Sequence, residues 1–279
     1  MSAALQTIGL SKRFGGLTAT DDVSFTLGHG ARHALIGPNG AGKTTFINLL
    51  TGVLSANEGT ILLEGEDVTR MAPQQRARRG LGRTFQINQL FGAMTPVESV
   101  GLAVSERMGG GGQFWRRLGK RADIVDEIVE LLRQFRLIEV MDEPTARLPY
   151  GKQRLLEIAV ALASQPRVLL LDEPAAGVPE AERGELLDTL AALPRDVSIL
   201  LIEHDMDLVF SFADRISVLV NGALFAEGTE AQDTNDRFFY DHDSGELWYD
   251  PDGTGDIRAR LVAEFTTHPD LHAADIFLL

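Results

Sequence analysis

The sequence of 279 residues contains no cysteine, which excludes disulfide bonds, thiolate zinc sites and cysteine nucleophiles and fits a reducing compartment. It contains no apolar run close to the roughly 20 residues that span a bilayer, and its first residues form neither a basic leader nor an apolar segment. Basic residues are scarce: 26 Lys and Arg stand against 40 Asp and Glu, a formal net charge of −14. Because binding of nucleic-acid phosphates needs a basic surface, this balance argues against nucleic acid as a partner. We expect a cytoplasmic, acidic globular protein.

Charge and aromatic residues are unevenly distributed along the chain. Residues 231–279 contain eleven acidic and three basic residues, a net charge of −8, which leaves −6 for the first 230 residues. The same segment holds seven of the nineteen aromatic residues. We therefore place a domain boundary near residue 230, between a domain over 1–230 and an acidic, aromatic extension over 231–279.

The first 230 residues show strand-like and helix-like segments in alternation. The unbroken apolar run at 168–171 is typical of a parallel strand buried on both faces, and 198–202 predicts a second apolar strand. Helical spacing of apolar residues predicts an amphipathic helix over 123–136. Further strands are expected over 23–27, 32–36 and 60–63, further helices over 44–50, 152–164 and 180–193, and a hairpin around Asn221-Gly222. This alternation favours an α/β core with a largely parallel sheet.

The segment Gly37–Thr45 fits the phosphate-binding pattern G-x-x-x-x-G-K-[ST], between a predicted strand and a predicted helix. Its glycines allow successive N–H groups to point inward at a helix N-terminus, where the helix dipole favours anions. Lys43 then supplies positive charge to the β- and γ-phosphates, and the Thr44 hydroxyl can coordinate Mg²⁺. A glycine turn with a chance lysine is the alternative, which the strand–loop–helix context disfavours. The other expected nucleotide contacts in this loop are Pro38, Asn39, Gly40, Ala41, Gly42 and Thr45.

Two adjacent carboxylates, Asp172 and Glu173, follow the apolar run at 168–171. In an open parallel sheet, ligands bind beyond the carboxyl ends of the strands. We therefore expect Asp172 to reach the metal ion, and Glu173, alternating to the other side, to accept a proton from the attacking water. The alternative is that the pair caps a helix beginning near Pro174. Beside a phosphate loop, we favour the catalytic interpretation.

Several short motifs, each weak alone, occur together in a specific order. Their sequences are Lys12-Arg13-Phe14-Gly15-Gly16-Leu17, Arg83-Thr84-Phe85-Gln86, Leu148-Pro149-Tyr150-Gly151-Lys152-Gln153, Asp172-Glu173-Pro174-Ala175-Ala176-Gly177 and Ile202-Glu203-His204-Asp205-Met206. With the phosphate loop, the set resembles the nucleotide-binding subunit of an ABC transporter and is most similar to the subfamily that takes up hydrophobic and branched-chain amino acids. The resemblance covers about residues 5–230. It implies a P-loop NTPase core of the ABC type, an antiparallel β edge and a helical subdomain over about 87–165 that contains the signature, Leu148–Gln153.

The resemblance also implies a role for each motif. Family members work as head-to-tail dimers that hold each ATP between one subunit's phosphate loop and the other's signature, so this chain needs a second copy or a paralogue. Gly151 would present backbone N–H groups to the γ-phosphate across the interface, and Gln86 would contact Mg²⁺ and sense the γ-phosphate. Glu173 would be the general base, His204 would hold the γ-phosphate and the water, and Phe14 would stack on adenine. ATP and Mg²⁺ are the implied cofactors.

In function, the resemblance implies an ATP-hydrolysing subunit that powers uptake of branched-chain or other hydrophobic amino acids from the cytoplasmic face of the plasma membrane. The implied partners are integral membrane permease subunits and, indirectly, an external solute-binding protein. Phe91, Met94 and Val97 are candidate contacts with the coupling helices of the permease. The alternatives are an ABC ATPase for another substrate, such as lipopolysaccharide or urea, and a soluble ABC ATPase of DNA repair, translation or iron–sulfur assembly.

Three residues depart from the family pattern. Pro149 stands where Ser is common in the signature, and Pro179 lies where Asn or Asp is usual after the catalytic carboxylate. Both place cross-dimer communication in question, but not nucleotide binding. Lys152 replaces a Gln or an acidic residue, and we expect it to be neutral in effect on a solvated face.

The segment 235–250 predicts two aromatic strands around a polar turn. Residues after about 230 resemble the C-terminal segment of RTX-type calcium-binding secreted proteins, without the glycine-rich repeats. Oxygen ligands at Asp250, Asp252, Thr254 and Asp256 are similar to a calcium loop, but Leu261 occupies the place of the bidentate Glu. A solvated acidic turn is therefore favoured over a calcium site. A secreted calcium-binding module is a further alternative for the chain, which an intact phosphate loop argues against.

Overall fold

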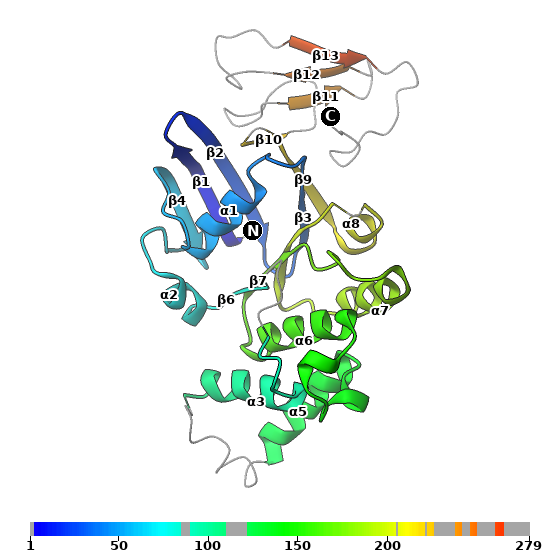
Figure 1. Ribbon diagram of the computed structural model, residues 1–279. Coiled ribbons are helices and arrows are strands. Elements are labelled where there is room, and N and C mark those ends of the chain that lie inside the picture. Colours follow the sequence, from blue (N-terminus) through cyan, green and yellow to red (C-terminus); the bar gives the residue numbers. More distant parts are fainter. Residues whose placement is uncertain are drawn as a thin grey trace.

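The structure is a computed structural model that describes residues 3–84, 90–109, 122–204, 206–220, 222–225, 238–241, 246–249 and 260–264. Strands in these ranges form a six-stranded, a four-stranded and a three-stranded sheet. Figure 1 shows the first two sheets side by side, a group of helices below them and the third sheet at the opposite end. None of the helices in the described ranges is long and apolar enough to cross a membrane.

The six-stranded sheet is parallel except at one edge. Its order is β10 (Ala223–Phe225), β9 (Arg215–Val220), β3 (Arg32–Ile36), β8 (Ser198–Ile202), β7 (Val168–Asp172) and β6 (Leu81–Arg83). Only the β9–β10 pairing, which includes the predicted hairpin, is antiparallel among the pairings of this sheet that the described residues make. Every residue of β3, β7 and β8 is buried, which confirms the largely parallel α/β core expected from the apolar runs.

The four-stranded sheet is antiparallel and packs beside the first. Its order is β2 (Leu17–Gly28), β1 (Ala3–Phe14), β4 (Glu58–Leu63) and β5 (Glu66–Asp67). This sheet is the expected antiparallel β edge. The long β1–β2 hairpin turns at Gly15-Gly16 and places Phe14 at its tip.

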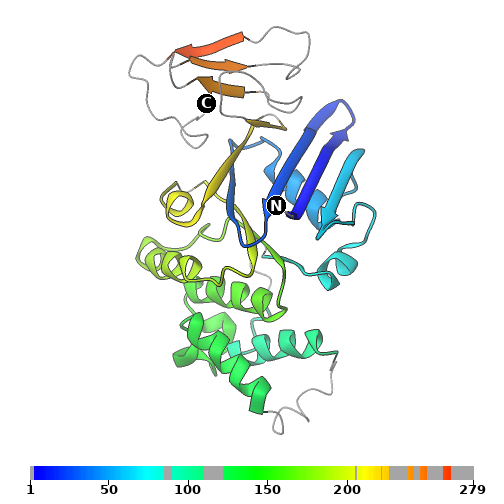
Figure 2. The same cartoon turned by 180° about the vertical axis from the view of Figure 1, so that it is seen from behind.

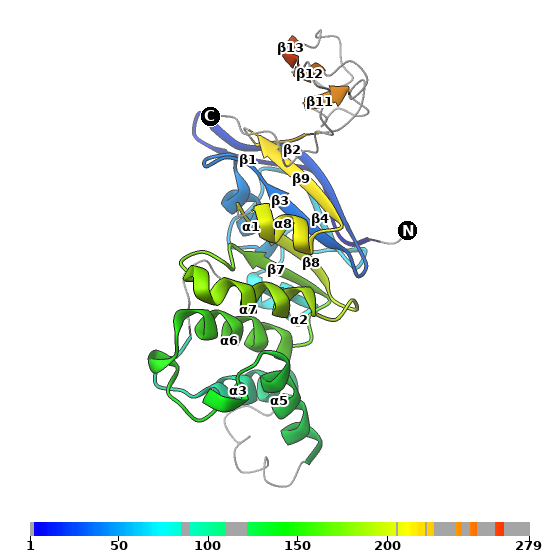
Figure 3. The same cartoon turned by 90° about the vertical axis from the view of Figure 1, so that its right-hand side faces the viewer.

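The helices divide between the two faces of the six-stranded sheet. They are α1 (Lys43–Thr51), α2 (Pro73–Arg78), α3 (Pro96–Arg107), α5 (Ala122–Gln134), α6 (Tyr150–Ala163), α7 (Glu180–Ala191) and α8 (Met206–Phe212), with 3-10 turns η2 (Ile138–Val140) and η3 (Thr145–Arg147). The helix α1 lies between the two large sheets, whereas α6 and α7 lie next to each other beyond the opposite face, with α3 and α5 packed against α6 (Figure 3). The helices predicted from spacing are therefore present, with ends shifted by one or two residues.

Two hydrophobic cores meet at the central strands. Alternate residues enter different cores: Leu169, Leu171, Ile199 and Leu201 join the helical core, and Val168, Leu170, Leu200 and Ile202 join α1 and the antiparallel sheet. Since both faces are covered, β7 and β8 are rigid supports for the loops that follow them.

The helix α1 is fixed at its C-terminal end by a buried arginine. Arg76 of α2 donates from Nη1 to the carbonyl oxygens of Leu49 and Leu50, both at 2.6 Å. Gly52, in the left-handed conformation, ends the helix there. A cation at the C-terminus also interacts favourably with the helix dipole. Because Arg76 fixes this end of α1, the position of the whole short helix relative to the loop is fixed as well.

The three-stranded sheet consists of β11 (Phe238–Asp241), β12 (Glu246–Tyr249) and β13 (Arg260–Glu264), paired antiparallel. The strands β11 and β12 are the two expected on either side of the polar turn. The sheet contacts the main body beside β10 and lies at the end of the molecule opposite to α3 and α5, as Figures 1 and 2 show. Asp250 to Asp256, the candidate calcium ligands, lie outside the described residues.

Candidate functional site

The loop between β3 and α1 has a backbone that only glycine permits at two positions. Gly37 and Gly42 have φ of +148° and +101°. A Cβ on Gly37 would lie 2.1 Å from the Leu219 carbonyl oxygen, and one on Gly42 would lie 2.2 Å from that of Ala19. The loop is therefore packed tightly against β9 and β2, and its backbone conformation depends on glycine at both positions.

The N-terminus of α1 is open. Gly42 precedes the helix in the left-handed conformation, and among the described residues no side chain caps it. The first N–H groups of an α-helix have no partner within the helix, and the dipole adds partial positive charge at this end. This end of α1 is therefore an anion site made of backbone.

Lys43 folds back over the loop. Its Nζ donates to the carbonyl oxygen of Gly37 and, at 3.0 Å, to that of Pro38. Burial lowers the pKa of Lys43, and the nearby charges of Glu173 and Asp172 act in the opposite direction. Since Thr44 is exposed beside it, an ammonium group and a hydroxyl oxygen lie at the mouth of the anion site.

Asp172, the last residue of β7, is buried and ion-paired. Its Oδ2 lies 2.9 Å from Nη2 of Arg83, whose Nη1 donates to the Asn48 side-chain oxygen of α1 at 2.8 Å. The guanidinium thus joins the ends of β6 and β7 to α1. The alternative that Asp172 and Glu173 cap a helix is wrong, because the next helix begins only at Glu180.

Glu173 lies in a left-handed conformation, with φ of +47°. Its N–H donates to the carbonyl oxygen of Ile202 at 2.9 Å, so the turn is fastened to the end of β8. The expectation that Glu173 simply alternates across a strand is corrected, because a turn, and not strand geometry, directs it. A non-glycine residue in this region is strained, and such strain occurs where the surroundings require one particular orientation.

A buried carboxylate that we did not predict, Glu203, joins this turn to His204. The Glu203 side chain is fully buried. Its Oε1 accepts from the Ala175 N–H and its Oε2 from the His204 N–H, both at 2.9 Å. The imidazole Nδ1 of His204 lies 3.5 Å from the same Oε2, and the imidazole itself is mostly exposed. Glu203 therefore sets the position of the segments that carry Glu173 and His204.

The structure brings most of the predicted residues to one edge. Because β3, β8 and β7 are consecutive in the sheet and parallel, the phosphate loop, His204 and the Asp172-Glu173 pair all follow their carboxyl ends. Phe14 lies on the separate antiparallel sheet, 47% exposed, with Lys12 Nζ 5.2 Å from its ring centroid. Gln86 lies outside the described residues.

The signature lies on the helical side, against α7. The Gly151 N–H, in the first turn of α6, donates to Oε2 of Glu182 at 2.7 Å. Lys152 Nζ donates to Oε1 of Glu185 at 2.6 Å and to the Arg136 carbonyl oxygen at 2.8 Å. The expectation that Lys152 lies on a solvated face is therefore wrong, since it is half-buried and paired with α7.

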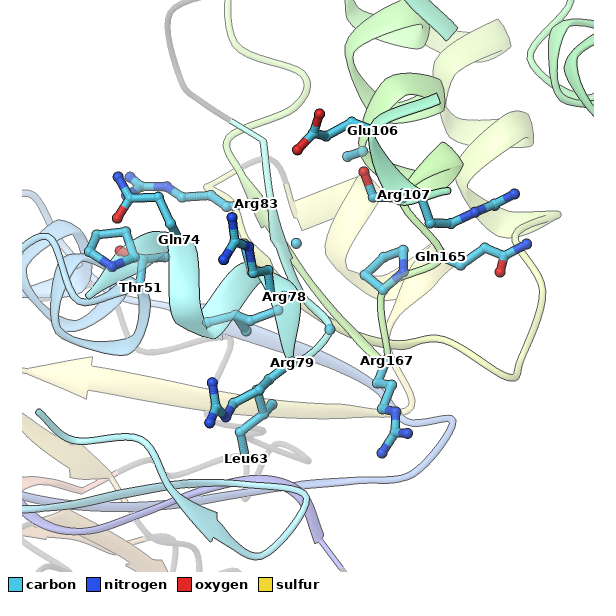
Figure 4. Close-up of a pocket in the computed structure, with 18 of the residues that line it drawn as sticks. Thr51, Leu63, Gln74, Arg78, Arg79, Arg83, Glu106, Arg107, Gln165 and Arg167 are labelled. Carbon is cyan, nitrogen blue, oxygen red and sulfur yellow. The ribbon is translucent and has the colours of Figure 1, made fainter. Parts of the chain in front are cut away.

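A groove of about 1300 Å³ lies beside the edge strand β6. In Figure 4, Arg78, Arg79 and Arg83 lie on the side of α2 and β6, Arg107 lies on α3, and Arg167 lies directly before β7. Among the described residues that line it, none belongs to the phosphate loop, and Leu90 is the first described residue after Gln86. The groove is thus separate from the anion site and adjoins the segment expected to meet the permease.

Sequence reasoning missed three residues that the structure places against the predicted site. Glu203 offered a signal, because it is acidic and directly follows the apolar run at 198–202, just as Asp172 follows the one at 168–171. Arg83 offered a weaker one, at the start of a quoted motif. Glu182 offered none, because its contact with Gly151 joins residues 31 apart and depends on how α7 packs against α6.

The chain is similar to known proteins over most of its length. A family described as ABC transporter matches residues 20–176. The high-affinity branched-chain amino acid transport ATP-binding protein LivG of Escherichia coli is 41% identical over 243 residues, covering 84% of this chain and 95% of that protein. BraF of Pseudomonas aeruginosa, with the same description, is 39% identical and covers 82% and 92%. A solved ATP-binding cassette of an ABC transporter in its ADP conformation superposes with a TM-score of 0.69 at 31% identity, covering 81% of this chain and 91% of that one.

Proposed function

Because this chain belongs to the ABC transporter family, as one of its ATP-binding and ATP-hydrolysing subunits, we propose that it powers the import of branched-chain or other hydrophobic amino acids. The observation that carries the ATPase part is the open N-terminus of α1, with Lys43 and two carboxylates beside it. The names of LivG and BraF favour amino acids over lipopolysaccharide or urea as the transported solute.

In this proposal the triphosphate lies on the first-turn N–H groups of α1. The Lys43 ammonium leaves the carbonyl oxygens of Gly37 and Pro38 and moves to the β- and γ-phosphates. Asn39, Gly40, Ala41, Gly42 and Thr45 complete the phosphate contacts, and Phe14 stacks on the adenine. The loop needs no rearrangement to bind, because its glycines already hold the required backbone.

Hydrolysis in this proposal uses the turn after β7. Glu173 takes a proton from the attacking water, and His204 holds that water and the γ-phosphate. Glu203 fixes both segments through their backbone N–H groups, so the base and the imidazole keep their separation during the reaction.

The oxygen donors at the site fit Mg²⁺. Thr44 offers a hydroxyl oxygen and Asp172 a carboxylate, the hard ligands that Mg²⁺ takes together with substrate phosphates. Among the described residues, no group of three or more His, Cys, Asp or Glu side chains is placed to hold a metal ion alone. We therefore assign Mg²⁺ to the nucleotide complex, with Thr44, Asp172 and Gln86 as its protein contacts. The ion neutralises charge on the phosphates when bound.

We assign the partners from the same family relationship. A second ATP-binding subunit, either a copy or a paralogue, supplies the signature Gly151 to each nucleotide. Permease subunits contact Phe91, which is 67% exposed, together with Met94 and Val97, next to the groove beside β6. The chain then lies at the cytoplasmic face of the membrane without crossing it, and an external binding protein delivers the solute to the permease.

Replacement of the base tests the ATPase part of the proposal. Glu173→Gln keeps the size of the side chain and removes the proton acceptor, so we expect hydrolysis to fall at least about a hundredfold while Mg-ATP binding is retained. Phosphate release and equilibrium binding, measured on the same preparation, separate the two properties. Turnover equal to that of the unmodified protein would remove Glu173 from this role.

Transport is tested on the whole assembly. ATP hydrolysis by the chain, co-purified with its permease and reconstituted in vesicles, should rise when a binding protein loaded with leucine, isoleucine or valine is added. Stimulation by another class of solute, and not by these, would contradict the assignment of the solute.

For the C-terminal region we propose a separate domain over residues 231–279, of RTX-like origin. Its support is the shift in composition near residue 230 and the resemblance of its sequence. We expect Asp250–Asp256 to form a solvated turn that does not bind calcium. Calorimetric titration of the full chain with Ca²⁺ should therefore show the same heat for the unmodified protein and for Asp252→Asn. A binding heat that is present in the unmodified protein and lost in Asp252→Asn would establish a calcium site instead.

A further inference from the structure

The N–H of Gly151 already has an anionic partner inside its own chain. Pro149 precedes α6 and has no side-chain group to cap it, so the first turn needs an external acceptor. Glu182 of α7 supplies it: its Oε2 accepts from Gly151 at 2.7 Å. A carboxylate oxygen on a helix N-terminus is chemically equivalent to a phosphate oxygen in the same place.

Gly151 and Glu182 are in close contact. A Cβ on Gly151 would lie 2.6 Å from Oε2 and 3.0 Å from Cβ of Glu182. Any group that approaches this N–H from the side of α7 must therefore displace the Glu182 carboxylate. The half-buried position of Glu182 strengthens its bond to the helix end, because less water competes for it.

Two neighbouring contacts show that the whole start of α6 is attached to the segment after Glu173. Lys152 pairs with Glu185, one turn along α7 from Glu182. The Tyr150 ring lies 3.3 Å from where a Cβ on Gly177 would be, in the turn after β7. Three consecutive signature residues thus contact residues 177–185 of the same chain.

We propose that Glu182 is an internal stand-in for the γ-phosphate, and that the nucleotide held by the second subunit displaces it from Gly151. This inference rests on the proposed function, which gives Gly151 to the partner's nucleotide. Glu182 then acts through Gly151 as a positioning residue: it holds the signature in the absence of ATP and sets the ATP concentration at which the two subunits close. Displacement also removes one polar contact between α6 and α7, and so links nucleotide capture to the helix that follows the Glu173 turn.

The two possible roles of Glu182 predict opposite changes in the KM for ATP. If Glu182 only supported α6, its loss would weaken the site and raise the KM for ATP or lower kcat. If it competes with the nucleotide, its loss removes a charged competitor and lowers the KM. A charge-assisted hydrogen bond lost from the competing state corresponds to about a tenfold change.

The experiment uses the complete transporter, purified with its permease subunits, and measures KM and kcat for ATP. We expect Glu182→Ala to lower the KM about tenfold with kcat within about twofold, and Glu182→Gln, which can still accept weakly, to fall between. The matched control is Glu185→Gln, which removes a charge from the same face of α7 but leaves the Gly151 contact; its KM should stay within about twofold.

An unchanged or raised KM in Glu182→Ala, or a loss of kcat alone, would overturn the inference while leaving the ATPase assignment in place. A shift of equal size in Glu185→Gln would also overturn it, because the effect would then come from charge in general. Failure of the unmodified complex to hydrolyse ATP would instead reject the proposed function, and the inference with it.

Discussion

Two helices of this chain carry the dipeptide Gly-Lys at their N-terminal end, Gly42-Lys43 at α1 and Gly151-Lys152 in the first turn of α6, and the two ends differ. At α1, Gly42-Lys43 opens a helix whose N–H groups no described side chain caps, and Lys43 turns back over the loop. At α6, Gly151 is bound by Glu182, and Lys152 turns away to Glu185. The first end is ready for an anion, and the second is closed by the chain's own carboxylate.

A short motif therefore does not determine its own function. The end of α1 is fixed by a preceding buried strand, by two glycines pressed against carbonyl oxygens and by Arg76 at the far end. The end of α6 is held by side chains of another helix, α7. Under the proposed function, this difference suits a cycle in which nucleotide binds first at α1 and the two subunits close afterwards.

Replacement of each lysine by alanine should give the largest difference between the two helix ends, measured as the affinity for Mg-ATP. Lys43→Ala should weaken Mg-ATP binding at least about a hundredfold, because contacts from a charged group to two phosphates are lost. Lys152→Ala should change it less than about threefold, because that ammonium is engaged by Glu185 and a backbone carbonyl. Titration calorimetry on both variants provides the measurement, and equal losses would contradict the distinction.

Acid should weaken the fold through the strand that leads into the open end. Burial, together with the charge of Arg215, lowers the pKa of His33 on β3 from 6.5 to about 4. Between these values the unfolded chain binds a proton that the folded chain does not. The contribution of His33 to the free energy of unfolding is therefore fully present above about pH 6.5, and it falls by roughly 3 kcal/mol as the pH approaches 4.

Urea unfolding at several pH values checks this dependence. His33→Gln, which cannot titrate, should lose most of the slope between pH 6.5 and 4, although its stability at pH 7 is lower because the ring contact with Phe25 is lost. The same slope in both proteins would assign the acid sensitivity to other groups.

A smaller effect is expected at Glu203, which belongs to the preformed half-site. In Glu203→Gln the amide has one acceptor oxygen for two N–H groups, those of Ala175 and His204. We expect kcat to fall about tenfold and the KM for ATP to change less than about twofold, because the phosphate loop is untouched. Steady-state kinetics with a thermal-unfolding control distinguish this from general damage; an unchanged kcat would show that the N–H contacts do not position the reacting groups.

The parts predicted from sequence are those that depend on neighbours in the chain. The phosphate loop, β7 and β8 were predicted because their apolar runs and glycine spacing are local. The strand β1 was not expected, because irregularities in its pairing with β2 interrupt the alternation of buried and exposed residues along it. The helix α3 was missed, although Thr95 and Glu98 form a capping box at its start. Glu182 and Arg83 act through packing between distant segments, which one sequence does not display.

The most direct test is the structure of Glu173→Gln bound to Mg-ATP in the complete transporter. We expect the phosphates on the first-turn N–H groups of α1, with Lys43 Nζ moved from the carbonyl oxygens of Gly37 and Pro38 to the β- and γ-phosphates. The second subunit's Gly151 N–H should then lie on the γ-phosphate and no longer on Glu182. Nucleotide bound elsewhere, with Lys43 still on its loop carbonyls, would contradict this expectation.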